Sequence, residues 1–152
     1  MAYTTVEARQ QLLDTLAEAA EEIGFALASL GEAYEQLDER TAERLEEELF
    51  RPLQTAYGRA KRSHAAFAER YALPSHTFAS HSPGAPSGGT KGFLDDAVEA
   101  VGRADGILAA LQDSMLPVEV GDVEVRAGIT EVRELLGGFR GRARELLRTL
   151  GR

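Results

Sequence analysis

The amino-acid sequence predicts an all-α protein, an antiparallel four-helix bundle built from two helical hairpins. Apolar residues recur at steps of three and four along four segments, which is the spacing of a helix with one buried face. Short joints connect the segments within each pair, whereas a long connection rich in Ser, Pro and Gly separates the two pairs. The length of 152 residues suits a single domain over 1–152 with its own core. The expected helices cover residues 5–37, 41–72, 91–116 and 122–150.

The segment 5–37 has an apolar seam with heptad spacing, which predicts a helix with one buried stripe. The seam consists of Leu13, Leu16, Ala20, Ile23, Leu27, Leu30, Tyr34 and Leu37. The segment 41–72 has a second stripe whose steps repeat over eleven residues, which predicts a straighter helix. This stripe consists of Leu45, Leu49, Leu53, Ala56, Ala60, His64, Phe67 and Tyr71. Pro52 lies inside the segment and has no backbone N–H, so it predicts a kink or a break into two helices.

The segments 91–116 and 122–150 form the second expected hairpin. The first has its stripe at Leu94, Val98, Val101, Ala104, Leu108, Leu111 and Met115, and the second at Val125, Ile129, Val132, Leu136, Phe139, Ala143, Leu146 and Leu150. Pro117 and Gly121 mark the joint between them. Apolar and polar residues alternate over 118–125, which also suits a short extended piece. Five glycines weaken these helices locally and can allow close helix–helix approach. They are Gly102, Gly106, Gly137, Gly138 and Gly141.

The connection 73–90 has 18 residues, among them four Ser, three Pro, three Gly and two His. Fully extended it reaches about 60 Å, more than the roughly 48 Å length of a 32-residue helix. Two topologies are therefore compatible with the sequence. In an up-down bundle, the connection packs across one end, and in a crossover bundle it runs back along the helices. The up-down arrangement is the simpler one and is the expectation.

In an up-down bundle the charges separate into an acidic and a basic end. The basic end would gather Arg59, Lys61, Arg62, Arg70, Lys91, Arg140, Arg142, Arg144, Arg148 and Arg152. The acidic end would gather Glu32, Glu35, Asp38, Glu39, Glu43, Glu46, Glu47, Glu48, Asp113, Glu119, Asp122 and Glu124. Complementing the helix dipoles explains much of this distribution. The acids at the end of segment 5–37 oppose the dipole, however, and suggest recognition of a charged partner or head-to-tail self-association.

Composition excludes several function classes. The chain has no Cys, so disulfides, thiolate zinc sites and cysteine catalysis are excluded. The net charge of −8 disfavours nucleic acid and anionic lipid as partners. The first thirty residues are too rich in charge for a signal peptide, and no apolar run approaches the length of a membrane span. The sequence thus predicts a cytoplasmic protein with no membrane partner.

The stretch from Gly84 to Lys91, GAPSGGTK, resembles a phosphate-binding loop in its glycine spacing. That loop requires Lys before Ser or Thr and a preceding β-strand, and this stretch has neither. Capping of the third helix by Ser87 and Thr90 is the simpler expectation.

The chain has three histidines, His64, His76 and His81. His64 falls on an apolar stripe, so we expect it to be partly buried and hydrogen-bonded to a neighbouring helix. His76 and His81 lie in the connection and can begin a metal site, but no further ligand is evident nearby, so metal binding by these two residues stays open. The residues three positions before the histidines are Lys61, Leu73 and Phe78, which excludes the Glu-x-x-His pairs of di-iron bundles.

Two functions are compatible with these observations. The main prediction is a non-enzymatic helical bundle that acts through protein–protein interaction or self-association, including a homodimer, with no catalytic residue and no cofactor or metal. The alternative is a binder of a small anion or nucleotide at the basic end. Its ligand-binding residues would be His81, Lys91, Thr90, His64, Arg62 and Arg144.

Overall fold

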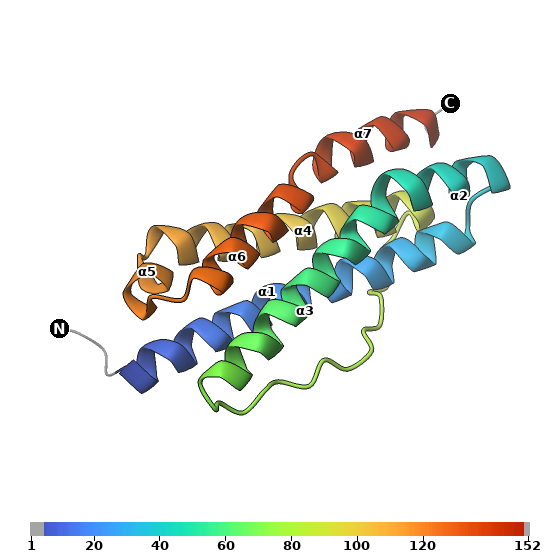
Figure 1. The fold of residues 1–152 in the computed structure, drawn as a ribbon. Coiled ribbons are helices and arrows are strands. Elements are labelled where there is room, and N and C mark those ends of the chain that lie inside the picture. The colour runs from blue at the N-terminus through green and yellow to red at the C-terminus, as the bar shows by residue number, and fades with distance from the viewer. Residues whose placement is uncertain (1–4, 151–152) are drawn as a thin grey trace.

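The computed structural model describes residues 5–150, and within this range it contains helices and no strand (Figure 1). The predicted all-α class is confirmed. The elements are α1 (Thr5–Glu35), α2 (Glu39–Leu45), the π-helical turn η1 (Glu46–Phe50), α3 (Arg51–Arg70), α4 (Gly89–Asp113), α5 (Leu116–Val120), α6 (Val123–Leu136) and α7 (Phe139–Leu150).

The long helices pack side by side with their apolar faces turned inward. α1 packs against both α3 and α4, and α6 packs against α3 and α4 from the other side. α7 continues beyond α6 along α4 and reaches η1 and α2. Pairs of contacts fix the directions. Thr90 and Arg103 of α4 meet Gln36 and Glu22 in reverse order along the chain. Arg59 and Arg70 of α3 likewise meet Glu131 and Glu124 of α6 in reverse order. Each of these long helices therefore runs antiparallel to the helices it touches, and the buried leucines and alanines meet in one core.

The connection between α3 and α4, residues 71–88, is called the strap. It runs along α1 instead of packing across one end, so the up-down expectation is wrong and the crossover alternative describes the path of the chain (Figure 1). His76 contacts α1 at Asp14, and His81 contacts it at Glu21. The next helix then begins beside Gln36. α3 and α4 consequently run in the same direction, and both contact α1 and α6.

The chain stays helical across Pro52, so a break into two helices at this residue is not found. The π-helical turn η1 ends two residues before Pro52, which lies in the first turn of α3, where a missing N–H is tolerated. Pro52 cannot donate to the carbonyl of Glu48, four residues earlier. Arg142 of α7 donates to this carbonyl from Nε at 2.8 Å.

The expectation of one continuous helix over 122–150 is wrong. Gly137 adopts an extended conformation and Gly138 has a φ of 79°, so α6 and α7 are separate helices. The short extended piece that the alternation over 118–125 also suited is not formed. The chain instead forms the short helix α5, bounded by Met115 with φ 67° and Gly121 with φ 76°.

Packing of α1 on two neighbours changes which residues are buried. Its buried face is wider than the predicted seam and includes Leu12, Ala19 and Ala26. Tyr34, a predicted seam residue, is 41% exposed. The close approach between helices occurs at Gly128, where an added Cβ would overlap Ser63 of α3. The glycines that we expected to allow such an approach within a helix, Gly102, Gly106 and Gly141, have open space where a Cβ would stand.

The predicted acidic and basic ends do not exist, because residues assigned to opposite ends contact each other. Arg70 binds both Asp122 and Glu124. Arg142 binds the backbone of Glu48. The crossing strap reverses the direction of α4 relative to the up-down arrangement, and this reversal mixes the two signs of charge. Arg152 lies outside the described residues.

Candidate functional site

The strap lies over a groove between α1 and α3, and all three histidines of the chain are in this region. His76 Nε2 lies 3.0 Å from Asp14 Oδ1, and His81 Nε2 lies 2.9 Å from Glu21 Oε2. The ring of His81 also meets the ring of Tyr57 edge to face, with a centroid distance of 6.3 Å. Burial, together with the charge of Glu21, raises the pKa of Tyr57. The strap thus contacts both helices through its histidines.

His64 lies beneath the strap and is 1% exposed. Its ring meets the rings of His76 and Phe78 edge to face, each at a centroid distance of 5.1 Å. Neither ring nitrogen has a hydrogen-bond partner within the described residues, so the expected bond to a neighbouring helix is not formed. Burial, aided by His76 and opposed by Asp14, lowers the pKa of His64. The site therefore favours the uncharged form of the His64 imidazole.

The residues of the predicted anion site do not share one location. His64 and His81 lie under or within the strap, and His81 rests against α1 at Gly24. Thr90 instead donates to the side chain of Gln36. Gln36 lies twelve residues after Gly24, and twelve residues of helix span about 18 Å. Lys91 pairs with Asp95 on its own helix.

The other two predicted residues, Arg62 and Arg144, lie on exposed faces of α3 and α7. The expected capping of α4 is likewise not found. Gly88, in the left-handed conformation, is the residue that precedes the helix, and it makes no side-chain cap. The glycine-rich stretch therefore forms a turn into α4 and holds no cluster of basic side chains.

Metal-ligating residues do not converge in the part of the chain that the structure describes. Between residues 5 and 150, no group of three His, Cys, Asp or Glu side chains is placed to hold an ion. His76 binds Asp14 and His81 binds Glu21. These two carboxylates lie about two turns apart along α1.

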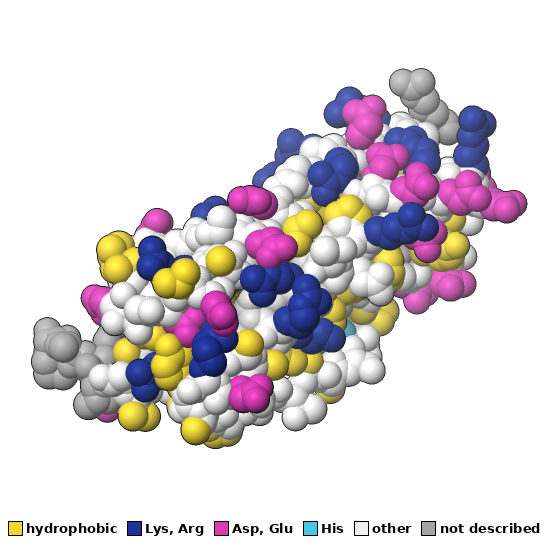
Figure 2. Space-filling view, viewed as in Figure 1, with side chains coloured by type: hydrophobic (Ala, Val, Ile, Leu, Met, Phe, Trp, Pro, Cys, Tyr) yellow, Lys and Arg dark blue, Asp and Glu magenta, His cyan; other side chains and the backbone are white. Residues whose placement is uncertain are grey.

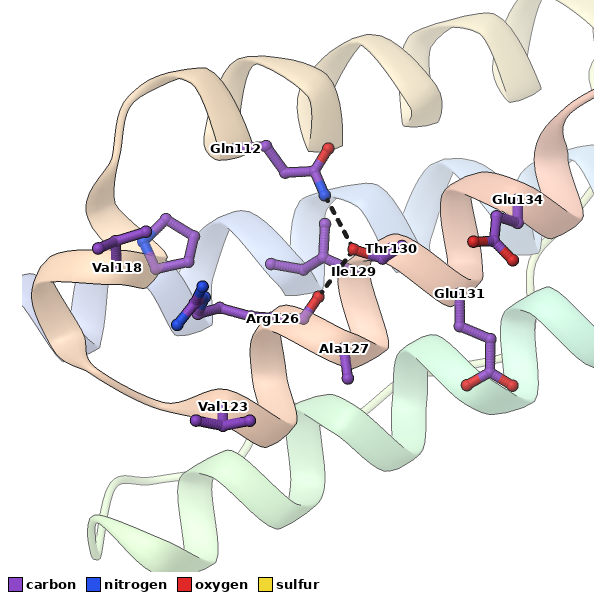
Figure 3. Close-up of a pocket in the computed structure, with 10 residues that line it drawn as sticks. Gln112, Val118, Val123, Arg126, Ala127, Ile129, Thr130, Glu131 and Glu134 are labelled. Atoms are coloured by element: carbon purple, nitrogen blue, oxygen red, sulfur yellow. Dashed lines mark hydrogen bonds between the residues drawn. The ribbon is translucent and has the colours of Figure 1, made fainter.

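A second region, which sequence reasoning missed, is an open groove between α4, α5 and α6 with a volume of about 570 Å³. We call it the α4–α6 groove. Figure 3 shows Gln112 of α4 on one side, Val118 of α5 and Val123 at one end, and Thr130 beside Gln112. Gln112 Nε2 donates to the Thr130 hydroxyl at 3.3 Å. The lining residues are Gln112, Pro117, Val118, Val123, Arg126, Ala127, Ile129, Thr130, Glu131 and Glu134.

Large exposed apolar side chains gather beside this groove. Val123 is 71% exposed, Met115 52% and Val118 46%. Val6, at the start of α1, is also exposed, and α1 contacts α5. Figure 2 shows apolar side chains over the end of the molecule that α5 and α6 form. Solvent-exposed apolar clusters next to a groove are typical of protein interaction surfaces.

The charges around the α4–α6 groove are mainly acidic. Glu134 lines the groove, and Asp113 and Glu119 follow the lining residues Gln112 and Val118 in sequence. All three are exposed and form no ion pair within 4 Å with another described residue, although Asp113 acts at longer range on Arg133, which donates to Gln112. Arg126 is the basic residue of the lining, and it also forms no such pair. Glu131 is already bound to Arg59. The groove thus combines an apolar floor with a rim of excess negative charge.

A sequence signal for this groove exists in the residues left over from the helix seams. Val118 and Val123 belong to no predicted stripe, because they lie in the joint between the last two segments. Such residues are candidates for an exposed surface, although Leu116 and Val120 of the same joint pack into the core.

Neither the protein-family models, nor the curated proteins, nor the solved structures contain a match to this chain. Across residues 5–150, no helix combines the length and the apolar character that a membrane span requires. The geometry of the chain itself is therefore the basis for assigning a function.

Proposed function

We propose that this chain is a non-enzymatic helical bundle that acts through protein–protein interaction at the α4–α6 groove. In this proposal α1, α2–α3, α4 and α6–α7 are the four helices of an antiparallel bundle whose strap crosses from one hairpin to the other. The observation that carries the proposal is the cluster of exposed Met115, Val118 and Val123 beside an open groove. Leaving such side chains in water forgoes about 25 cal/mol for each Å² that a partner would bury.

The chemistry of the groove favours an amphipathic helix with basic flanks as its occupant. The apolar floor formed by Pro117, Ala127 and Ile129 suits the apolar face of such a helix. The unpaired carboxylates of Asp113, Glu119 and Glu134 suit Lys or Arg on its flanks. A second copy docking through the same surface would bring these carboxylates against one another, so a different protein is the favoured partner.

The test uses two synthetic amphipathic peptides of the same apolar pattern, one with Lys and one with Glu at the polar positions. Fluorescence anisotropy should show binding of the Leu/Lys peptide and no binding of the Leu/Glu peptide. Val118→Ser combined with Val123→Ser should weaken binding at least about tenfold, because both side chains lose apolar contact. These substitutions add no charge and affect exposed residues, so the helical fold should persist by circular dichroism.

Tyr34→Ser, at an exposed apolar position near the opposite end of α1, is the control and should leave binding unchanged. Equal binding of the Leu/Lys peptide to wild type and to the double variant would contradict the proposal, since it would mean nonspecific attraction to an acidic protein. Light scattering across a concentration series tests whether the chain binds a second copy of itself instead. A dimer that the double variant abolishes would replace the foreign helix by a second copy of this chain.

A further inference from the structure

The middle of the strap is hydrogen-bonded to the helices through imidazole groups. Residues 74–87 form no backbone–backbone hydrogen bond with another described residue. The hydrogen bonds from these residues to α1 are those of His76 with Asp14 and of His81 with Glu21. Since a segment without backbone pairing depends on its side chains, the strap can separate from the helices without disturbing their hydrogen bonds.

The groove is shaped to receive one of these histidines. The ring of His81 lies against the backbone of α1 at Gly24, where a Cβ would overlap it. Glycine in the middle of a helix is unfavourable by about 1 kcal/mol relative to alanine. Gly24 is buried, and its missing side chain makes the space that His81 fills. The closed position of the strap is therefore a specific seat.

His64, at the bottom of the same groove, is the group that acid would affect most. The titratable groups that face it are His76 on the strap and Asp14 on α1. Further along the groove lie His81, Glu21 and Tyr57, with Lys61 Nζ over the Tyr57 ring at 4.2 Å. Neither ring nitrogen of His64 has an acceptor among the described residues, so a proton there would leave a buried charge without a hydrogen-bond partner.

We propose that the strap is an acid-released latch, in which protonation of His64 drives residues 74–87 away from the groove between α1 and α3. The closed state holds His64 neutral, whereas the open state exposes it to water and lets it take up a proton. The open state therefore binds more protons, and lowering the pH below about 6.5 favours opening. Two features favour the closed state instead, because protonated His76 and His81 attract Asp14 and Glu21.

Opening in acid requires that these two attractions be weaker than the effect at His64. The side chains of His76 and Asp14 are 41% and 55% exposed, so solvent screens their interaction. Glu21 is 50% exposed, whereas His81 is 16% exposed, so this second pair is screened less than the first. His64 is buried on all sides, and its charged form also faces His76 at close range. The strap lies on elements other than those of the α4–α6 groove, so the latch and the proposed function can be tested separately.

The experiment exploits the absence of Cys from the chain. Spin labels at Ser80→Cys on the strap and Gln54→Cys on α3, both exposed positions, report the distance between strap and helix by pulsed electron paramagnetic resonance. Between about pH 7.5 and about pH 5, the distance distribution should become longer and broader, with a midpoint below about 6.5. Circular dichroism at the same pH values should show that the helices remain folded.

Two variants separate His64 from the other histidines. His64→Phe keeps an aromatic ring against Phe78 but cannot be protonated, so its strap should stay closed at about pH 5. His64→Leu is the second non-titrating variant, for use where phenylalanine does not fit. His81→Gln keeps a donor for Glu21 but loses the attraction of a protonated imidazole, so its strap should still open on acidification, with a midpoint at or above that of the wild type. A strap that stays closed in the wild type at about pH 5, or one that opens equally in both His64 variants, would overturn the proposal.

Discussion

Arg142 of α7 donates a hydrogen bond of 2.8 Å from Nε to the backbone carbonyl of Glu48. An α-helix would satisfy this carbonyl through the N–H four residues later, but that residue is Pro52, which has none. A side chain nearly one hundred residues away in sequence thus substitutes for a missing backbone donor. This bond also ties α7 to η1, at the place where the helix after α2 is irregular.

Arg142→Met should therefore destabilise the protein by about 1.5–3 kcal/mol, the value of a hydrogen bond with a charged donor. In a Pro52→Ala background the cost should be smaller by at least about 0.5 kcal/mol, because the backbone N–H that this substitution restores can donate to the Glu48 carbonyl. Urea unfolding of the two single variants and the double variant measures this coupling. Arg140→Met, at an exposed position on the same helix, should change stability by less than about 0.5 kcal/mol. If Arg142→Met costs the same in the wild type and in the Pro52→Ala protein, the Arg142 side chain does not stand in for the missing N–H of residue 52.

Two glycines of α1 should respond oppositely to alanine. Gly31→Ala should stabilise the protein by up to about 1 kcal/mol, because its Cβ meets nothing within 4 Å. Gly24→Ala should be less stable than Gly31→Ala by at least about 1 kcal/mol, because the new methyl overlaps the ring of His81. Thermal unfolding compares the two variants.

Removal of His81 provides the control for the Gly24 prediction. In a His81→Ala background, Gly24→Ala should become stabilising, by up to about 1 kcal/mol, since the obstructing ring is gone. If Gly24→Ala still lowers the stability of the His81→Ala protein, then contact with the His81 ring is not the reason for the loss.

Asp122 should contribute more to the free energy of unfolding than Asp105, an acid in a more exposed ion pair. It is 5% exposed, accepts from the Val125 backbone as the N-cap of α6, and binds Arg70 and the Tyr71 hydroxyl. Asp122→Ala should cost about 2–4 kcal/mol, from the lost cap and the unpaired Arg70. Asp105→Ala, which breaks the half-exposed pair with Arg133, should cost less than about 1 kcal/mol. Urea unfolding at neutral pH distinguishes these values, and equal costs would contradict the special role of Asp122.

The same carboxylate predicts a pH dependence. Burial raises the pKa of Asp122, but hydrogen bonds from Arg70, the Val125 amide and Tyr71 outweigh it, so the pKa lies below its ordinary value. The folded state therefore holds Asp122 ionised at pH values where the unfolded chain takes up a proton. Its contribution should be complete above about pH 4, the unfolded value, and should disappear as the pH falls through the lower folded value.

The stability difference between the wild type and Asp122→Asn should accordingly be constant from about pH 7 to about pH 5 and shrink below about pH 4. Urea titrations over this range measure it. A difference that stays constant down to about pH 2 would show that the hydrogen-bonding geometry, and not the charge, provides the contribution.

Sequence spacing was sufficient for locating the helices, since the period of a helix is a local property of consecutive residues. Leu45, Leu49 and Leu53 are buried as their spacing predicts, even though a π-helical turn lies among them. The failures were at glycines: Gly137 and Gly138 end α6, although the apolar seam continues through them. Apolar spacing does not report backbone conformation, so the seam alone could not show that break.

The candidate sites were less accessible to sequence reasoning. His64 was expected to be buried, and it is, but its missing hydrogen bonds depend on which groups the strap brings beside it. The α4–α6 groove depends on α5, a short helix whose alternating residues had suggested an extended piece. Short segments have too few residues for their period to distinguish the two conformations.

The sequence by itself determined the helical class and most of the buried apolar residues, because both follow from composition and short-range spacing. Only the tertiary structure decided the path of the strap, and with it the neighbours of every charge. The strap is long enough for either topology, and its local sequence favours neither. The crossing places Arg70 beside Asp122, seats His81 at Gly24 and covers His64, which are relationships between residues far apart in the chain.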